Sequence, residues 1–448
     1  MNKHPLLSKL LVIFSLMLLL SVPLLMVFDT IQERSAYRAE AATEVARAHA
    51  GAQTITGPVL YVPYTETFTR TVLVETGRGE TREERVTQAH VALRFPTRLD
   101  TRSQLDTQTR WRGIFPVTVY TSQHAGTGRF VWTEITPQHR GGQLTLGQPL
   151  LLMGVSDARG LLAAPQLRLA GSPLPVGQAP AGAPLPLAAR LDPARLQPGA
   201  TLDFDLQLDL AGTGRIGWVP LADENSVTLT SPWPPPTFTG DFLPRTRAIS
   251  ASGFEATWRV PSLSSQAQAQ FAQKGDQRPP LEQFSVALED PVDVYRLTER
   301  ATKYAMMFIM LTFAAFFVLE MVKRWRIHPM QYLMIGAALV LFFLLLLSLS
   351  EHLDFAWAYL VASAACIGLL THYLRHVLRG WRPALGMSAM LVALYGVLYG
   401  ILISEDNALM MGSLLLFGVL AAIMVVTRKV DWYSVMGSPP EPPRQPAQ

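Results

Sequence analysis

The sequence has a single cysteine, and charged residues are scarce in two of its parts. Its 448 residues include only Cys366, so no disulfide can form within the chain. A domain of the size available here can bury enough core without one, so this lack does not exclude an extracytoplasmic location. Residues 1–28 and 305–427 are strongly apolar, whereas the stretch between them has the mixed composition of a soluble domain. The chain therefore divides into membrane and soluble parts.

An excess of basic residues is also missing from the soluble part. Residues 29–300 hold 26 Lys and Arg against 27 Asp and Glu, so the sequence pI near 9.2 arises from the rest of the chain. No run of basic residues with interleaved aromatic residues occurs between residues 29 and 300. This composition argues against a nucleic-acid partner.

The first apolar segment predicts a membrane anchor that is not removed. Leu10–Phe28 has no charged residue and follows Lys3 and Lys9. Its length is close to the roughly 20 residues that span a bilayer as a helix. A cleaved signal peptide has a shorter apolar core of about 7–15 residues, closely followed by a small-x-small site. Ala39-Glu40-Ala41 matches that site but lies too far beyond Phe28, so we favour an anchor.

Five further apolar runs predict membrane helices, because each is long enough to span a bilayer. They are Tyr304–Val322, Met330–Leu349, Phe355–Leu374, Ala384–Ile403 and Asn407–Thr427. The loops that follow them alternate in charge. The basic loop residues are Lys323, Arg324, Arg326, Arg375, Arg379, Arg382, Arg428 and Lys429, and the acidic ones are Glu351, Asp354, Glu405 and Asp406. Basic residues in short loops stay in the cytoplasm. We therefore expect six helices, both termini in the cytoplasm and residues 29–300 in the periplasm.

Alternating patterns predict that the soluble part is rich in β-strands. Thr201–Leu210 alternates without a break, with Leu202, Phe204 and Leu206 on one face and mostly acidic residues on the other. This pattern is typical of a half-buried antiparallel strand. Many short strands with few helices predict a sandwich or two stacked sheets. The expected strands are Thr65–Glu75, Arg85–Phe95, Pro116–Ser122, Arg129–Ile135, Thr201–Leu210, Ser226–Thr230, Phe254–Val260 and Phe284–Glu289.

Three segments of the soluble part have other patterns. Asp29–Ala50 is rich in Ala, Glu and Arg and is expected to continue the first helix as a stalk. Gly171–Gly199 is dense in Pro, Gly and Ala, and is either a link between two β lobes or a long surface loop. Ser262–Pro280 is rich in Gln, Ala and Ser and is expected to be an exposed loop. The expected domains are residues 1–28 (anchor), 29–300 (periplasmic β-rich domain with its stalk), 301–434 (five membrane helices) and 435–448 (disordered cytoplasmic tail).

A set of local strings, in this order along the chain, resembles the CreD family of bacterial inner-membrane proteins over about residues 5–434. The strings are Gly57-Pro58-Val-Leu-Tyr-Val-Pro63-Tyr64, Val155-Ser-Asp157-Ala-Arg159-Gly160, Ser231-Pro-Trp233-Pro, Gly240-Asp241-Phe-Leu-Pro244, Ser252-Gly253-Phe254-Glu-Ala-Thr-Trp258, Arg300-Ala-Thr302-Lys303-Tyr304, His328-Pro329-Met-Gln331-Tyr332-Leu, Leu345–Ser350 with Glu351-His352, and Asp431-Trp432-Tyr433-Ser434. The resemblance implies a member of the regulon of the Cre two-component system, linked to cell-envelope integrity, tolerance of certain colicins and responses to β-lactam stress. It implies no known biochemical activity.

Glu351, His352 and Asp354 are the candidate functional residues, at the outer end of an expected membrane helix. His and carboxylate side chains suit a metal site or a proton site. A polar helix end at the water interface is the simpler explanation, and we favour that interpretation. A zinc site needs a third or fourth ligand, and no spaced partner is present. We therefore predict no metal, no cofactor and no catalytic residue.

Other motifs are interpreted as structural. Glu320 is expected to form an ion pair with Lys323 or Arg324 at helical spacing. Gly396 and Gly400 are expected to let helices pack closely.

Two glycine-containing strings and the scattered histidines also give no site. Asp157-Ala-Arg159-Gly160 and Gly240-Asp241 are expected to be turns, where Gly supplies unusual backbone angles and Asp bonds locally. His90, His124 and His139 have no metal-binding spacing.

Three functions remain open, in order of preference. The first is a non-enzymatic inner-membrane protein that supports envelope integrity and responses to envelope stress or antibiotics. It would act through periplasmic contacts with other envelope proteins or components, besides the lipid bilayer. The second is a permease or lipid-handling protein that uses the six helices, with a cavity between them. The third is a periplasmic enzyme, which would need a cleft with convergent Asp, Glu or His residues. The absence of a catalytic motif places it last.

Overall fold

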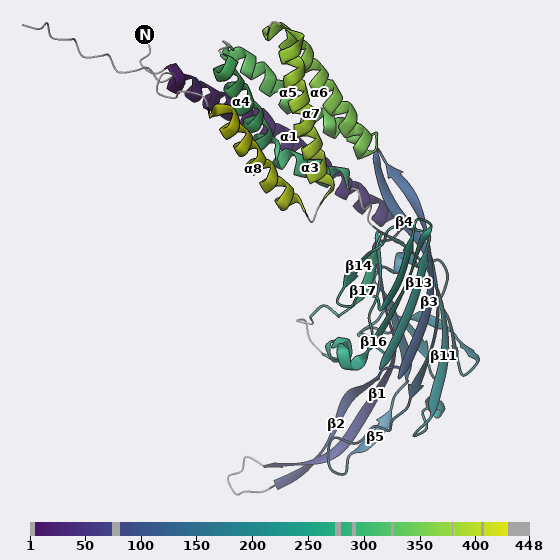
Figure 1. Ribbon diagram of the computed structural model, residues 1–448. Helices are drawn as coiled ribbons and strands as arrows, with labels where there is room; N and C mark the ends of the chain where they lie inside the picture. The colour runs from purple at the N-terminus through teal and green to yellow at the C-terminus, as the bar shows by residue number, and fades with distance from the viewer. Residues whose placement is uncertain are drawn as a thin grey trace, which may run out of the picture. The chain divides into compact units, whose positions relative to one another are not determined.

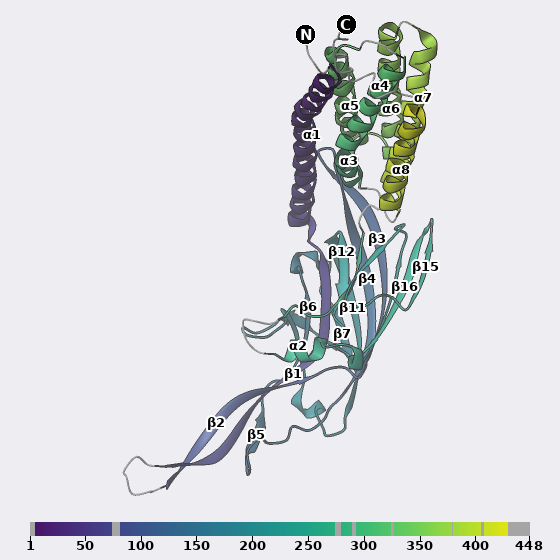
Figure 2. The ribbon, with the colours of Figure 1, turned by 60° about the vertical axis from the view of Figure 1, so that its left-hand side comes forward.

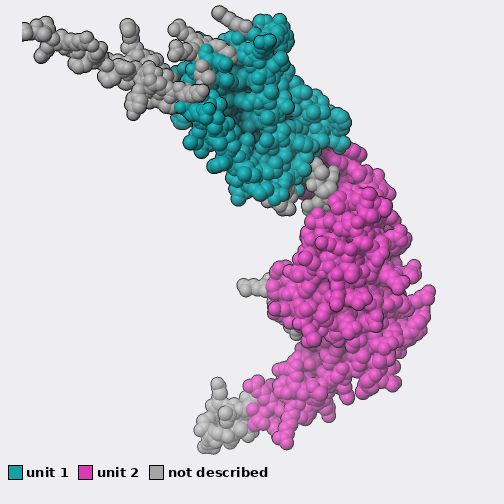
Figure 3. All heavy atoms as spheres, in the orientation of Figure 1, with its two compact units in different colours: residues 1–38, 292–448 teal, residues 39–291 magenta. Residues whose placement is uncertain are grey.

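The structure of the chain is a computed structural model, shown in Figure 1. It describes residues 5–73, 81–273, 279–288, 293–323, 327–378, 380–404 and 407–428. Two compact units are present, shown in teal and magenta in Figure 3. Unit 1 comprises residues 1–38 and 292–448, and unit 2 comprises residues 39–291. The predicted tail at 435–448 lies outside the described residues.

Unit 1 is helical. Its elements are the first part of α1 (Pro5–His49), α3 (Val294–Lys303), α4 (Ala305–Lys323), α5 (Pro329–Ser350), α6 (Phe355–Val377), α7 (Trp381–Ile403) and α8 (Ala408–Thr427). Apart from α3, long and mostly uncharged runs form these helices, because a helix satisfies all its backbone groups within one segment. Among the described residues, five helices are long and apolar enough to cross a membrane. A sixth candidate is α3 with α4, if this pair, bent by 43°, is one span.

The helix α3 was not predicted from the sequence. It is short and largely polar, so it lacks the apolar length that identifies a membrane span. Asp293 begins it by accepting hydrogen bonds from the backbone N–H groups of Tyr295 and Arg296. Such a side-chain cap satisfies donors that the first turn of a helix leaves free.

Unit 2 is built on two sheets. The nine-stranded sheet has the order β14-β17-β12-β1-β6-β10-β9, and both β2 and β5 also pair with β1. Its strands are β1 (Gln53–Leu73), β2 (Thr81–Arg94), β5 (Gln143–Leu146), β6 (Leu150–Val155), β9 (Val176–Gln178), β10 (Leu187–Arg190), β12 (Arg215–Trp218), β14 (Thr237–Gly240) and β17 (Phe284–Ala287). The eight-stranded sheet has the order β15-β16-β13-β3-β4-β11-β7-β8. Its strands are β3 (Arg98–Arg112), β4 (Phe115–Val131), β7 (Gln166–Leu169), β8 (Ser172–Leu174), β11 (Thr201–Thr213), β13 (Glu224–Ser231), β15 (Thr246–Ser250) and β16 (Gly253–Pro261).

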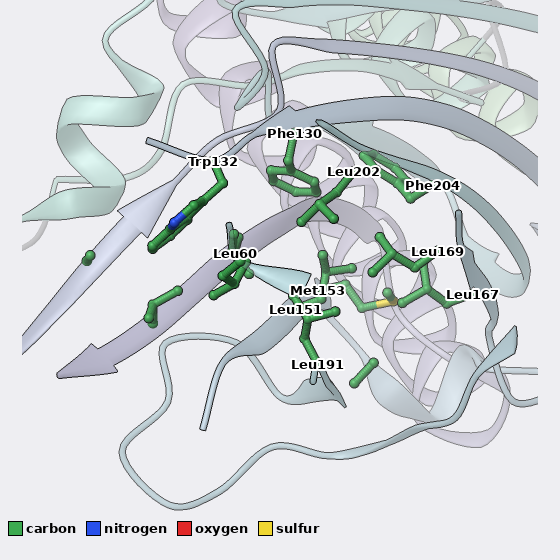
Figure 4. Close-up of a cluster of buried hydrophobic side chains, with 14 of the residues drawn as sticks. Leu60, Phe130, Trp132, Leu151, Met153, Leu167, Leu169, Leu191, Leu202 and Phe204 are labelled. Carbon is green, nitrogen blue, oxygen red and sulfur yellow. The ribbon is translucent and has the colours of Figure 1, made fainter. Parts of the chain in front are cut away.

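The core of unit 2 lies between these sheets, which confirms a sandwich-like domain. Figure 4 shows Leu60 and Leu151 from the nine-stranded sheet beside Phe130 and Phe204 from the eight-stranded sheet. Phe204 belongs to the alternating β11, whose apolar side chains are buried and whose acidic side chains are mostly exposed, as predicted. A second cluster also joins both sheets around the fully buried Trp258. The described residues therefore form one sandwich.

Two segments expected to be loops contribute to this sandwich. Gly171–Gly199 contains β8, which pairs in the eight-stranded sheet, and β9 and β10, which pair in the nine-stranded sheet. It is therefore neither a link between lobes nor simply a surface loop. Ser262–Pro280 contains α2 (Ala267–Ala272), whose Ala267 and Phe271 pack on the outer side of the nine-stranded sheet. That segment is thus partly buried, because its apolar residues cover the sheet.

The strands β1 and β2 form a ribbon that continues beyond the sheet. Their pairing runs from Leu60–Arg94 to Leu73–Thr81, whereas β6 and β5 pair with β1 no further than Thr67. Figures 1 and 2 show this ribbon leaving the rest of unit 2. We call β1–β2 from Tyr64 to His90 the arm.

Candidate functional site

The structure separates the three candidate residues Glu351, His352 and Asp354. Glu351 follows α5, and its carboxylate accepts a hydrogen bond from the hydroxyl of Tyr295 at 3.1 Å. Arg34 Nε lies 3.7 Å from the same carboxylate, whose side chain is only 9% exposed. His352 and Asp354 are exposed. Among the described residues, no group of three or more His, Cys, Asp or Glu could hold a metal ion.

Glu351 instead belongs to a cluster of ionic contacts within unit 1. Arg38 Nη1 lies 2.7 Å from Asp293 Oδ1, and its guanidinium lies over the ring of Tyr295 at 5.9 Å. Arg34 and Arg38 are one helical turn apart on α1, so they reach the start of α3 and the end of α5 from one face. The cluster therefore holds three helices together at one end of the unit.

Glu320 has a partner that the local spacing did not predict. Its carboxylate forms an ion pair with Lys9 of α1 and accepts hydrogen bonds from the Tyr332 hydroxyl (3.1 Å) and the Ile327 N–H (3.2 Å). Glu320 is 8% exposed. The predicted pairing with Lys323 is wrong, because the Glu320 carboxylate pairs with Lys9 and has no ion pair with Lys323 in the described part of the chain. Arg324 lies outside the described residues. Pairing within the bundle satisfies a carboxylate that would be costly if left alone in an apolar region.

Gly396 and Gly400, which were expected to act together, differ in their surroundings. A Cβ on Gly400 would approach Met411 of α8 to 2.8 Å, so this glycine does allow close packing. A Cβ on Gly396 would meet nothing within 4 Å. Helix packing therefore explains Gly400 but does not explain Gly396.

The string 155–160 forms the joint between α1 and the sandwich. Asp157 accepts hydrogen bonds from the backbone N–H of Gly51 (2.9 Å) and of Arg159 (3.1 Å). Arg159 donates to the carbonyl of Arg47 near the end of α1 at 2.7 Å. The guanidinium of Arg159 and the N–H of Gly51 hold the pKa of Asp157 well below its usual range. The predicted turn is present, but the residues also fix the position where α1 ends.

The arm contains a buried carboxylate beside two histidines. Glu66 is fully buried and accepts the backbone N–H of His139 at 2.8 Å. His139 Nδ1 lies 3.2 Å and His90 Nε2 lies 4.0 Å from Glu66 Oε2. The ring of His139 stacks on Phe68 with 3.5 Å between centroids. Burial favours the neutral acid, but the hydrogen bonds from His139 outweigh it and lower the pKa of Glu66.

Sequence spacing missed this group because its members come from three separate segments. The available signal was Glu66 itself, an acidic residue at an alternate position between Tyr64 and Phe68 in an expected strand. His124, a histidine of the same sandwich, lies elsewhere in its core. It contacts Ser103 (2.7 Å) and Ser122 (2.9 Å), and burial lowers its pKa to about 3. It is therefore neutral and structural.

The lowered pKa of Glu66 predicts that the arm loosens in acid. A carboxyl whose folded pKa lies below its usual 4.5 contributes stability above that pH, and this stability is lost as pH falls through the folded pKa. As the pH decreases below 4.5, we therefore expect the hydrogen-exchange protection of β1 and β2 to decrease in the full-length chain, after correction for intrinsic exchange rates. Glu66→Gln should remove this pH dependence. Glu83→Gln, an exposed site on the same ribbon, should retain it; equal behaviour of the two variants would contradict the assignment.

The outer face of the eight-stranded sheet carries a polar groove. A cavity of about 540 Å³ adjoins a second one of about 490 Å³, and both are lined by Gln104 and Thr230. Arg102, Gln123 and Gln207 also line the first cavity and are exposed. None of the side chains of Arg102, Gln104, Gln123, Gln207 and Asp209 hydrogen-bonds to another residue in the described part of the chain. We call this surface the sheet groove.

The sandwich and the apolar helices together define a membrane protein with a large β-rich domain. Residues 5–433 match the family described as inner membrane protein CreD. The chain is 36% identical over 443 residues to inner membrane protein CreD of Escherichia coli (strain K12), covering 97% of this chain and 95% of that protein. The chain therefore belongs to the CreD family, as its local strings indicated, and is a multi-pass inner-membrane protein.

The solved structures that match this chain are too dissimilar to support a conclusion about its fold or function. The M1 zinc metallopeptidase of Deinococcus radiodurans and a mutant of that enzyme bound to a Tyr-Ser-Ala substrate each give a TM-score of 0.20, with 10% and 12% identity. The match covers 43% of this chain and 42% of the metallopeptidase chains, so this chain spans less than half of their length.

Proposed function

We propose that this chain is a non-enzymatic inner-membrane protein that supports cell-envelope integrity and the response to envelope stress or antibiotics. The sandwich lies in the periplasm and both termini lie in the cytoplasm. The alternating loop charges support this orientation, with Arg375 and Arg382 on one side and Glu351 and Asp354 on the other.

The sheet groove is the observation that carries the proposal. The amide groups of Gln104, Gln123 and Gln207 and the guanidinium of Arg102 converge on one face, and they have no partner among the described residues. An exposed set of donors and acceptors of this kind suits a polar envelope component, because each direct hydrogen bond contributes about 1 kcal/mol. Arg102 adds one positive charge, and Asp209 and Glu255 add two negative charges. The face therefore suits a largely neutral, hydrogen-bonding partner better than a strongly charged one.

The proposal predicts that changes in the sheet groove abolish protection against envelope stress without removing the protein. In a strain that lacks the chromosomal gene, full-length Gln104→Ala/Gln207→Ala should fail to restore growth on a β-lactam. Loss of two hydrogen bonds corresponds to roughly tenfold or more in affinity. The control is Gln108→Ala, which lies on β3 outside the groove and should complement fully at equal protein levels.

A shortened chain separates the sandwich from the helices. Rescue by residues 1–300 would support action through periplasmic contacts. Full protection by the Gln104→Ala/Gln207→Ala variant would contradict a role for the sheet groove. Rescue only by chains that retain residues 301–434 would contradict contacts as the whole function and would make the helices a working part.

A further inference from the structure

A groove lies between α6 and α7, and the small side chains that line it do not fill it. Its volume is about 770 Å³, and small residues, including Ser363, Ala364, Gly368 and Gly396, form much of its wall. A Cβ on Gly368 or Gly396 would meet no atom within 4 Å. These two glycines therefore keep space open and do not bring helices together, which accounts for Gly396.

The length of the groove, and the aromatic residues at one of its ends, match a site within one membrane leaflet. It runs along α6 from Ala356 to Gly368, or ~18 Å at 1.5 Å per residue, compared with ~15 Å for half of a bilayer core. Trp357, 62% exposed, lies at the end where α6 begins. Tyr399, near the end of α7, joins it there, with its ring 5.0 Å from that of Tyr359. Trp and Tyr concentrate where membrane helices meet the headgroups.

The wall of the groove offers almost nothing to a polar ligand. The Tyr359 hydroxyl donates to the carbonyl of Tyr395 at 2.7 Å, and Ser363 Oγ donates to the carbonyl of Leu360 at 3.0 Å. These hydroxyl groups are satisfied within the protein, so beyond Trp357 and Tyr399 at one end the wall is mostly aliphatic and aromatic carbon. A hydrocarbon ligand fits such a wall without leaving a buried polar group unpaired.

We propose that the α6–α7 groove binds one acyl chain of a bilayer phospholipid, in the leaflet at which α6 begins. The groove is continuous with the lipid-facing surface of both helices, since its own lining residues Leu360 and Val392 are each 55% exposed. In a multi-pass membrane protein the bilayer covers that surface, so acyl chains are present at the mouth of the groove. This inference is independent of the proposed periplasmic contacts.

The test uses the full-length chain in nanodiscs that contain a phosphatidylcholine with a diazirine in the middle of one acyl chain. After illumination, mass spectrometry of peptides should place more adducts on α6 and α7 than on α8. The exposed Leu414, Phe417 and Leu420 of α8 report ordinary contact with bulk lipid. Gly396→Leu fills the groove and should lower the α6–α7 adducts by about tenfold, equivalent to ~1.4 kcal/mol.

A matched variant distinguishes filling the groove from disturbing the helix. Gly386 also lies on α7 with no atom within 4 Å of an added Cβ, but it does not line the groove. Gly386→Leu should leave the adducts unchanged, and size-exclusion chromatography should show both variants folded. Equal adducts on α6–α7 and α8, or equal losses in the two variants, would overturn the proposal. Crosslinks between α6–α7 of two chains in place of lipid adducts would overturn it in favour of a second copy.

Discussion

Lys9→Met is expected to destabilise the helical unit by about 2–4 kcal/mol. Removing one partner of a buried ion pair leaves the other charge uncompensated, at a cost of about 3–5 kcal/mol when burial is complete. Glu320 is 8% exposed, but the Lys9 side chain is 24% exposed, so water reduces the cost. Tyr332 and Ile327 still donate to the carboxylate, but neither carries a compensating charge. The measurement is equilibrium unfolding of the full-length chain in micelles.

Two further variants test the cause of this loss. Lys9→Met/Glu320→Gln removes both charges and keeps an oxygen that can accept from Tyr332 and Ile327, so it should recover most of the stability. Lys323→Met removes an exposed charge from the same end of α4 and should change stability by less than about 0.5 kcal/mol. If Lys9→Met and Lys323→Met behaved alike, the ion pair would have no structural role.

The membrane helices were predictable because one local property identifies them. A run of about 20 residues without charge forms a helix in a bilayer whatever its neighbours are, and the observed bounds of α5 (Pro329–Ser350) differ from the prediction by one residue at each end. The partner of Glu320 was not predictable. Lys9 lies 311 residues away, and only the packing of α1 brings it near.

The sandwich was predictable as a class but not strand by strand. An unbroken alternation of apolar residues revealed β11, whereas β3 was missed completely. The buried side of β3 includes Ser103, whose hydroxyl bonds to His124, so a polar residue occupies a core position and hides the pattern. The expected strand Pro116–Ser122 and the first three residues of the expected Arg129–Ile135 belong to the single strand β4, because the polar stretch between them pairs with β11. Residues 132–135 lie beyond the end of that strand. Partners distant in sequence decide such positions.

The candidate residues show the same limit. Glu351 is drawn into a cluster with Arg34 and Tyr295, while its neighbours His352 and Asp354 remain exposed. Adjacent positions after a helix end point in different directions, so proximity in sequence did not make them one site. The α6–α7 groove and the sheet groove form where no side chain fills the space between neighbouring elements. A single sequence does not reveal where the fold leaves such space.

Gly160→Ala is expected to destabilise the joint by about 2–6 kcal/mol. The sequence suggested that glycine here supplies an unusual backbone angle, as Gly240 does with φ +96°. Gly160 has no such angle, and its role is to leave space. A Cβ would overlap Gln53 Nε2 and the carbonyl oxygen of Ala211. Overpacking costs about 1–3 kcal/mol, and displacing Gln53 from its buried bond to Ala211 adds about 1–3 kcal/mol.

The position of the damage distinguishes this cause from general loss of stability. Hydrogen exchange should accelerate first at the start of β1 and the end of β11, where Gln53 and Ala211 lie, before the rest of the sandwich opens. Gly177→Ala on β9 is the control, because its Cβ would meet no atom within 4 Å, and it should be neutral. Uniform acceleration throughout unit 2 would assign Gly160 to the general core. Unchanged exchange would show that the structure around Gly160 accommodates an added methyl group. The close contact among Gly160, Gln53 and Ala211 would then have no role in holding α1.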